Sequence, residues 1–232
     1  MPVAIVTGGS RGLGEALVAG LLERGWSVVT DARDPAALAA TADQLRATAS
    51  GGLLVAVPGD VTDAEHRREL VTAATGLGPL GLVVNNAGGL GPSPLPNLAG
   101  YSLDALSELF EVNVAAPLAL IQEALPALRA ARGVIVNITS DAGVEAYPGW
   151  GGYGATKAAL DQVSRVLAAE EPEVAVYAID PGDLRTQMHQ DAFPGEDISD
   201  RPLPATSVPG VLAIVEERPP SGRYQAREQV SP

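Results

Sequence analysis

The chain has 232 residues, which suits one large domain better than two. Its net charge of −13 argues against a nucleic-acid partner or an anionic membrane surface, because an acidic protein repels both, and so favours a small-molecule ligand. The sequence has no cysteine and two histidines, which excludes disulfides and thiolate chemistry and disfavours a metal site. No apolar stretch has the length of a membrane span and no leader precedes the first apolar run, so we expect a cytoplasmic protein.

Short runs rich in valine, isoleucine and alanine alternate with longer stretches of helical periodicity. Strands are predicted at 2–7, 27–31, 53–57, 81–85, 133–139, 174–179 and 222–226. Helices are predicted at 12–25, 35–49, 63–77, 102–130, 151–171 and 204–217. Pro117 and Pro126 should kink the fourth helix or end it early. Strands such as VAIVT are apolar on both faces, which predicts burial from both sides. The pattern indicates an α/β fold, a doubly wound seven-stranded parallel sheet with helices on both faces, as a single domain over 1–232.

A glycine-rich stretch, TGGSRGLG at 7–14, lies between the first strand and the first helix. In that setting Gly8, Gly12 and Gly14 let the backbone pass close to a pyrophosphate at the N-terminal end of the helix. The spacing TGxxxGxG differs from the GxGxxG of longer dinucleotide-binding domains. By itself the stretch is equally consistent with a tight turn followed by a helix cap.

Tyr153 and Lys157 are four residues apart, so on a helix they share one face. A nearby ammonium favours the phenolate and should lower the pKa of the tyrosine from about 10. Tyr153 is then suited to act as a general acid in reduction and a general base in oxidation. Ser140 follows the strand GVIVNIT, at the strand end where open α/β sheets bind ligands, and its hydroxyl is suited to donate to a substrate oxygen. The alternatives are that Ser140 caps a turn and that Tyr153 only packs.

Four motifs occur in order: TGGSRGLG, NNAG at 85–88, Ser140, and YGATK at 153–157. Together they resemble the short-chain dehydrogenase/reductase family, over nearly the whole chain from Val3 to about Thr186. The resemblance implies a nicotinamide-dependent oxidoreductase that interconverts a ketone or aldehyde and an alcohol. It adds Asn113 as the residue that holds a water connecting Lys157 to solvent, although Asn113 could instead only bond to helix backbone. The catalytic residues implied are Asn113, Ser140, Tyr153 and Lys157.

The same resemblance assigns cofactor contacts to the glycine loop, the adenine-side pair DV, the ribose side of NNAG and the segment PGxxxT. Asp183 stands in that segment where many members carry valine or isoleucine, so the local polarity differs. The cofactor-binding residues implied are Gly8, Ser10, Arg11, Gly12, Leu13, Gly14, Arg33, Asp60, Val61, Asn86, Ala87, Gly88, Tyr153, Lys157, Pro181, Gly182 and Thr186.

The end of the second strand, VVTDARD, bears on which nicotinamide cofactor is used. Counting from Gly25 by resemblance, the residue that meets the adenosine ribose is Ala32, where members that use NAD carry an acidic side chain. Asp31 falls one residue early and should point to the opposite face. Arg33 and Arg11 are suited to bind a 2′-phosphate, which predicts a preference for NADP(H). NAD(H) is the alternative, because a shift of one residue would place Asp31 on the ribose.

The substrate pocket is expected to be mostly apolar, which fits a hydrophobic carbonyl or alcohol better than a sugar phosphate. A substrate-side loop is expected at about 183–210, where prolines and glycines interrupt regular structure. The residues expected to line the pocket are Ala142, Val144, Tyr147, Trp150, Met188 and Phe193. Relatives commonly pair the helices that correspond to 102–130 and 151–171, so we expect a homodimer or homotetramer.

Two other functions remain open. A nucleotide-sensing regulator on the same fold usually lacks the tyrosine or the lysine, and both are present here. A redox-neutral epimerase or dehydratase would use the bound cofactor without net turnover of it.

Overall fold

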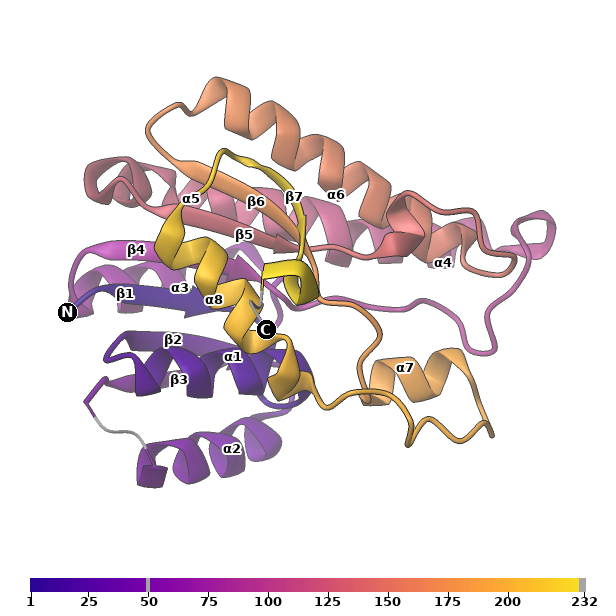
Figure 1. Cartoon of the computed structure of the whole chain (residues 1–232), viewed down its shortest axis with the longest axis horizontal. Coiled ribbons are helices and arrows are strands. Elements are labelled where there is room, and N and C mark those ends of the chain that lie inside the picture. Colours follow the sequence, from indigo (N-terminus) through magenta and orange to yellow (C-terminus); the bar gives the residue numbers. More distant parts are fainter. Residues whose placement is uncertain (49–50, 230–232) are drawn as a thin grey trace.

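Seven parallel strands form one sheet in the order β3-β2-β1-β4-β5-β6-β7 (Figure 1). The computed structural model describes residues 1–48 and 51–229. The doubly wound sheet predicted from the sequence is thereby confirmed. The chain reverses its direction of winding between β1 and β4, and open α/β sheets bind ligands at the carboxyl ends of the strands beside that point. The strands are β1 Val3–Val6, β2 Ser27–Ala32, β3 Leu54–Pro58, β4 Leu80–Asn85, β5 Val134–Ile138, β6 Ala175–Asp180 and β7 Gly222–Gln225.

Helices cover both faces of the sheet because alternate residues of each central strand are apolar. In β1, Ala4 and Val6 belong to a core that also holds residues of α1 and α8, whereas Val3 and Ile5 belong to a second core under α3 and α5. All four of these strand residues are fully buried. The helices are α1 Gly12–Glu23, α2 Pro35–Thr48, α3 Ala64–Leu77, α4 Leu103–Phe110, α5 Ala116–Ala131, α6 Gly151–Glu170, α7 Gln187–Ala192 and α8 Val208–Glu217.

The fourth predicted helix, 102–130, is interrupted in the turn that precedes Pro117. Pro117 lies in the first turn of α5, where its missing N–H costs no helical hydrogen bond, and α5 continues past Pro126 to Ala131. The interruption is a π-helical turn at Glu111–Ala115, between α4 and α5. The helix is thus irregular in the turn before Pro117, Pro126 does not end it, and the irregular turn is the segment that carries Asn113.

The stretch Leu103–Ala131 is, within the described residues, the one helical run long and apolar enough to cross a membrane by length and composition. Core helices of soluble proteins meet the same criteria. Here Leu120, Ile121 and Leu128 are buried against the sheet, so we assign α5 to the core.

The segment predicted as a substrate-side loop, 183–210, contains the short helix α7 and a 3₁₀ turn at Pro204–Thr206. The last helix begins at Val208 rather than at 204, because the prolines at 202 and 204 hold the preceding backbone extended or in the tight turn. The predicted helix 35–49 ends at Thr48, and its last residue lies outside the described residues.

Candidate active site

The candidate site lies at the carboxyl ends of the strands. In Figure 1 the strand arrows point toward the end of the molecule where α7 and the segment before α4 extend beyond the sheet. The glycine loop follows β1, NNAG follows β4, Ser140 follows β5 and the Pro181-Gly182 turn follows β6. Parallel pairing therefore brings all four sequence motifs to one edge of the sheet.

The glycine loop is closely packed beneath the first turn of α1. Gly8 has φ +73°, and a Cβ atom there would lie 3.0 Å from the Cα of Ala87. A side chain at Gly14 would collide with the carbonyl oxygen of Gly8. Only glycine fits both positions, so the loop brings its backbone, and the free N–H groups of the α1 N-terminus, close to the surface. Such a helix terminus is suited to bind an anion.

Hydrogen bonds join the NNAG segment to the glycine loop. The Thr7 hydroxyl oxygen accepts from the backbone N–H groups of Asn86 and Ala87, both at 3.0 Å. The Asn86 side-chain amide donates to the carbonyl oxygens of Thr7 at 2.8 Å and Gly8 at 3.3 Å. The ends of β1 and β4 thus form one rigid unit.

A buried ion pair, to which the sequence analysis gave no role, supports the glycine loop from below. One carboxylate oxygen of Asp31 accepts from the Gly8 N–H at 2.7 Å, and the other lies 2.9 Å from His66 Nε2. The hydrogen bond to Asp31 raises the pKa of His66, although burial opposes it. Asp31 is only 1% exposed, so its carboxylate is directed under the loop and away from the surface. This agrees with the strand alternation, which turned Asp31 away from the ribose position.

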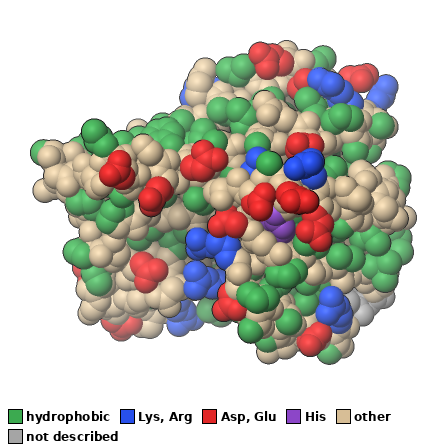
Figure 2. Space-filling view, turned by 180° about the vertical axis from the view of Figure 1, so that it is seen from behind, with side chains coloured by type: hydrophobic (Ala, Val, Ile, Leu, Met, Phe, Trp, Pro, Cys, Tyr) green, Lys and Arg blue, Asp and Glu red, His purple; other side chains and the backbone are tan. Residues whose placement is uncertain are grey.

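Arg11 and Arg33, the residues expected to bind a 2′-phosphate, are both exposed, and neither forms a salt bridge within residues 1–48 and 51–229. Burial raises the pKa of Asp60, but hydrogen bonds from Thr62 and the positive charge of Arg33 outweigh it and leave that pKa below its usual value. The effect places Arg33 beside the expected adenine-side residues. Figure 2 shows a local gathering of basic side chains near the centre of a face that also carries many acidic ones.

Tyr153 and Lys157 lie on one face of α6, as predicted, and Lys157 Nζ is 5.4 Å from the centre of the Tyr153 ring. The expected lowering of the tyrosine pKa is not found. Burial, together with the carboxylates of Asp180 and Asp141, raises the pKa of Tyr153 well above its usual value. Burial also lowers the pKa of Lys157 to about 8, and its ammonium donates to the carbonyl oxygen of Ile138 at 2.8 Å. These surroundings favour the neutral phenol of Tyr153, because burial disfavours the charged form.

Ser140 follows β5 and precedes the short turn Asp141–Gly143. Its hydroxyl accepts from Ala142 N–H at 3.2 Å and donates to Asp141 at 3.0 Å, which caps the short turn Asp141–Gly143. A hydrogen bond to Ser140 also opposes the rise in the pKa of Tyr153. The capping interpretation and the proximity to Tyr153 are thus both correct.

Asn113 connects the loop after β4 to α6. Its side chain accepts from Gly89 N–H at 2.8 Å and donates to the Gly89 carbonyl at 2.9 Å and to Thr156 Oγ1 at 3.0 Å. A Cβ atom on Gly88 would lie 3.2 Å from Asn113 Oδ1 and 3.9 Å from Lys157 Nζ. Asn113, Gly88 and Lys157 therefore meet at one point.

A buried chain of amides, absent from the sequence analysis, fixes α6 on the sheet. Asn85 on β4 donates to Asn137 on β5 at 2.8 Å, and Asn137 donates to Ser164 on α6 at 2.8 Å. The adjacent strand register, Asn85 opposite Asn137, is what brings the two amides together. Such a fully buried network holds α6, and with it Tyr153 and Lys157, in one position.

Hydrogen bonds hold the Pro181-Gly182 turn after β6, and Thr186 beyond it approaches the glycine loop. The Asp180 carboxylate accepts from Gly182 N–H at 2.9 Å, and the Pro181 carbonyl accepts from the Ser207 hydroxyl at 2.7 Å. Thr186 caps α7, and its methyl carbon would be 3.6 Å from a Cβ atom on Gly12. Thr186, expected at the nicotinamide end of a dinucleotide, thus lies close to the loop expected to hold the pyrophosphate.

An apolar cluster borders Tyr153 on the substrate side. Trp150 has its ring centre 5.8 Å from that of Tyr153 and 5.9 Å from that of Phe193. Two of the residues expected in this pocket lie elsewhere. The Tyr147 hydroxyl donates to Asp141 at 3.1 Å, and Val144 lines a separate cavity between α6 and β7, because the turn after Ser140 directs these side chains outward. The cluster consists of Leu90, Leu95, Ala142, Trp150, Tyr153, Met188, Ala192 and Phe193.

Comparison with known proteins gives one consistent result. The family described as short chain dehydrogenase matches residues 2–197. The chain is 37% identical over 192 residues to L-fucose dehydrogenase of Mus musculus, covering 82% of this chain and 67% of that protein. It is 37% identical over 195 residues to the rhamnolipids biosynthesis 3-oxoacyl-[acyl-carrier-protein] reductase of Pseudomonas aeruginosa. That match covers 80% of this chain and 74% of the other protein. The alcohol dehydrogenase of the archaeon Thermococcus sibiricus, solved with 5-hydroxy-NADP, superposes with a TM-score of 0.86 at 27% identity, covering 97% of this chain and 95% of that one.

Proposed function

Because this chain belongs to the short-chain dehydrogenase/reductase family of alcohol and carbonyl oxidoreductases, we propose that it is an NADP(H)-dependent enzyme that interconverts a ketone or aldehyde and an alcohol by hydride transfer. The observation that carries the proposal is the meeting of Ser140, Tyr153 and Lys157 at the strand ends, beside a glycine cradle and an apolar cluster. The substrate is a small molecule.

The residues present fit a dinucleotide. In this cradle a Cβ atom would be crowded at Gly8 and would collide at Gly14, while Gly12 has the positive φ of +62° that favours glycine, and the N-terminus of α1 above it offers free N–H groups to a pyrophosphate. Asp60 and Val61 would hold the adenine, Asn86 to Gly88 the ribose side, and Pro181, Gly182 and Thr186 the nicotinamide end. The bound nicotinamide would supply or accept the hydride.

The preference for NADP(H) is supported by the surroundings of the second strand. Asp31 is buried and both of its oxygens are bonded, so it is unsuited to hold ribose hydroxyls, and Ala32 at the ribose position has no polar side chain. Arg11 and Arg33 are exposed at that end of the cradle. One charge-assisted hydrogen bond from each to a 2′-phosphate contributes about 1.5–3 kcal/mol. Two such bonds favour NADPH over NADH by at least about 100-fold.

The proton chemistry is assigned to Tyr153. A raised pKa keeps its phenol protonated, which suits a proton donor to the oxygen of a carbonyl substrate during reduction. Ser140, which lies beside Tyr153, would hold the same substrate oxygen. Asn113 would hold a water that returns a proton by way of Lys157, whose own pKa of about 8 permits proton exchange near neutrality.

The substrate is proposed to carry an apolar group next to its carbonyl carbon. Trp150, Met188 and Phe193 form the apolar wall beside Tyr153, and the loop 183–210 that carries two of them would cover the substrate. The relatives named above act, by their names, on a sugar and on an acyl chain. The apolar wall favours the second kind of substrate for this chain.

A parallel assay tests the proposal. Purified protein is supplied with NADPH or NADH and a panel of ketones, aldehydes and quinones, and consumption is followed at the nicotinamide absorbance band. Turnover with NADPH and a lower Kd for NADPH than for NADH are expected. Binding of NADPH with no turnover of any carbonyl would favour the nucleotide-sensing regulator, and product formation without net NADPH consumption would favour the redox-neutral reaction. A homodimer or homotetramer and a cytoplasmic location stay predictions.

A further inference from the structure

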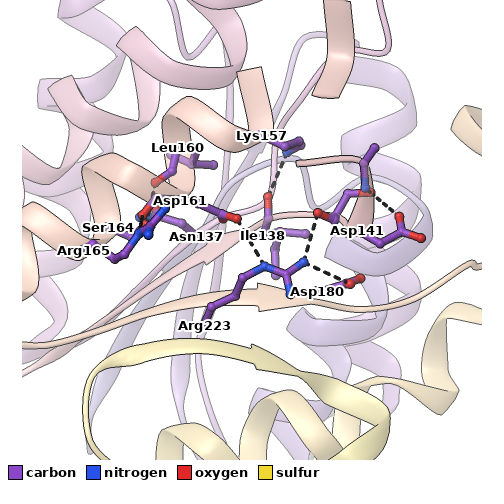
Figure 3. Close-up of polar contacts among 12 residues, drawn as sticks. Asn137, Ile138, Asp141, Lys157, Leu160, Asp161, Ser164, Arg165, Asp180 and Arg223 are labelled. Carbon is purple, nitrogen blue, oxygen red and sulfur yellow. Dashed lines mark hydrogen bonds and ion pairs between the residues drawn. The ribbon is translucent and has the colours of Figure 1, made fainter. Parts of the chain in front are cut away.

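Arg223 lies on the edge strand β7 and extends toward the reaction centre. It is paired with Ala178 in the parallel register, and strand alternation places it on the face covered by α6. Its guanidinium contacts three segments of the site, as Figure 3 shows for its two carboxylate partners. Nε lies 3.2 Å from Asp161 and one terminal nitrogen 3.3 Å from Asp180, while that nitrogen also donates to the carbonyl oxygen of Ser140 at 3.1 Å.

Each of these contacts leads to a residue with a proposed role. Ser140 lies beside Tyr153 and opposes the rise in its pKa. Asp180 holds the Gly182 N–H through its other oxygen, and so fixes the turn at the nicotinamide end. Asp161 lies one helical turn after Lys157 on α6. One planar guanidinium thus joins the three segments in a fixed geometry.

The same contacts set the charge around Tyr153 and Lys157. The carboxylates that face them are Asp141, Asp161 and Asp180, and Arg223 neutralises the last two. Both of these carboxylates are almost fully buried, with side-chain exposures of 4% and 7%. Buried carboxylates without a cation would act strongly on neighbouring groups, because little water screens them.

We propose that Arg223 is a positioning residue for the reaction: it fixes Ser140, the Pro181-Gly182 turn and α6 relative to one another and neutralises Asp161 and Asp180. This inference rests on the proposed function. Arg223 lies outside residues 2–197, over which the family description matches.

A cavity of about 140 Å³ lies beside this arginine and makes a specific test available. The cavity is between α6 and β7 and is lined by Val144, Asp161, Arg165, Val176 and Arg223, among others. Removal of the Arg223 side chain would enlarge it, which allows a small guanidinium ion to enter and contact the same carboxylates.

The test compares Arg223→Ala with the wild type in the carbonyl assay. Misplacement of a catalytic group by about 1 Å costs about 100-fold in rate, so kcat should fall by about that factor while the Kd for NADPH changes little. Methylguanidinium at low millimolar concentration should restore much of kcat, whereas methylammonium should not, because it lacks the planar fork. Arg223→Lys should retain part of the activity. Arg129→Ala, which removes an exposed pair with Glu171, is the matched control and should behave as wild type.

The pH profile supplies a second readout. In the wild type the rate of reduction should decline as Lys157 deprotonates above pH about 8. In Arg223→Ala the unneutralised Asp161 should hold the proton on Lys157 more strongly, which moves that decline to higher pH, and the added change Asp161→Asn should reverse the shift.

The outcomes separate this inference from the proposed function. A wild type without carbonyl turnover refutes the function. A working wild type with Arg223→Ala at unchanged kcat and pH profile overturns the inference alone. A folded Arg223→Ala, judged by circular dichroism and NADPH binding, that is inactive but not rescued by methylguanidinium also overturns it.

Discussion

Replacing Asp31 by alanine should destabilise the protein by about 3–5 kcal/mol, because that is the usual cost of removing one partner of a buried ion pair. Asp31 accepts from the Gly8 N–H at 2.7 Å and pairs with His66 at 2.9 Å, and both side chains are at most 5% exposed. The change leaves a backbone donor and an imidazole buried without their acceptor. For a chain of this length each kcal/mol of lost unfolding free energy lowers Tm by about 2–4 °C, so Tm should fall by about 6–20 °C.

Thermal unfolding followed by circular dichroism measures this effect, with Asp43→Ala as the control. Asp43 is also a carboxylate in a pair, with Arg46, but its side chain is 78% exposed, so its loss should cost less than about 1 kcal/mol. Equal Tm values for the two variants would refute the role given to Asp31.

The same pair predicts a pH dependence of stability. The pKa of His66 is raised in the folded protein, so protonated His66 contributes to the free energy of unfolding. This contribution is fully present below the unfolded pKa of about 6.5, and it is lost as the pH rises through the higher pKa of the folded protein. His66→Gln should remove this loss of stability above pH about 6.5. A wild type whose unfolding free energy does not decrease in that range would contradict the assignment.

Three further changes test the cofactor and proton assignments. Arg33→Ala should raise the Kd for NADPH by about 10- to 100-fold and leave that for NADH nearly unchanged, measured by nicotinamide fluorescence; an equal effect on both would contradict 2′-phosphate recognition. Gly14→Ala should abolish binding of both cofactors in the same titration, since the new methyl group would collide with the Gly8 carbonyl; retained binding would show that the cradle is not used. Asn113→Ala should lower kcat by about 10- to 100-fold with little change in NADPH affinity, by steady-state kinetics, and an unchanged kcat would remove it from the proton route.

Local sequence patterns predicted the sheet and the positions of the motifs well. Strands such as VAIV are apolar at every position, and this requires a core on each face, which the helices between the strands supply. The motifs follow strand ends in the sequence, so parallel pairing alone brings Gly8, Asn86, Ser140 and Gly182 to the same edge.

Features that depend on distant contacts were not predictable in the same way. Asp31 and His66 are 35 residues apart and form no motif, and their pairing depends on how α3 packs under β2. Arg223 meets Asp161 only because β7 lies beside β6 and α6 covers both. The pKa of Tyr153 is raised, whereas the spacing to Lys157 predicted that it would be lowered. The spacing is a local feature of the sequence, but the burial that raises the pKa depends on the whole fold.

The π-helical turn at Glu111–Ala115 also escaped prediction. Helical periodicity continues through it with little change, and although Pro117 predicts an irregular helix, a proline does not predict a π-helical turn. The consequence for the site is local, because the turn holds Asn113 against Gly89 and Thr156.

Tyr153→Phe tests the central claim most directly, with Tyr224→Phe as the matched control, because the Tyr224 hydroxyl donates to the carbonyl oxygen of Pro220, away from the site. The assay is single-turnover oxidation of bound NADPH by a carbonyl substrate that the wild type reduces. Loss of the general acid should slow turnover by about 100- to 10,000-fold with NADPH affinity retained, while the control reacts as wild type. A Tyr153→Phe variant that reduces the substrate at the wild-type rate would contradict the proposed mechanism.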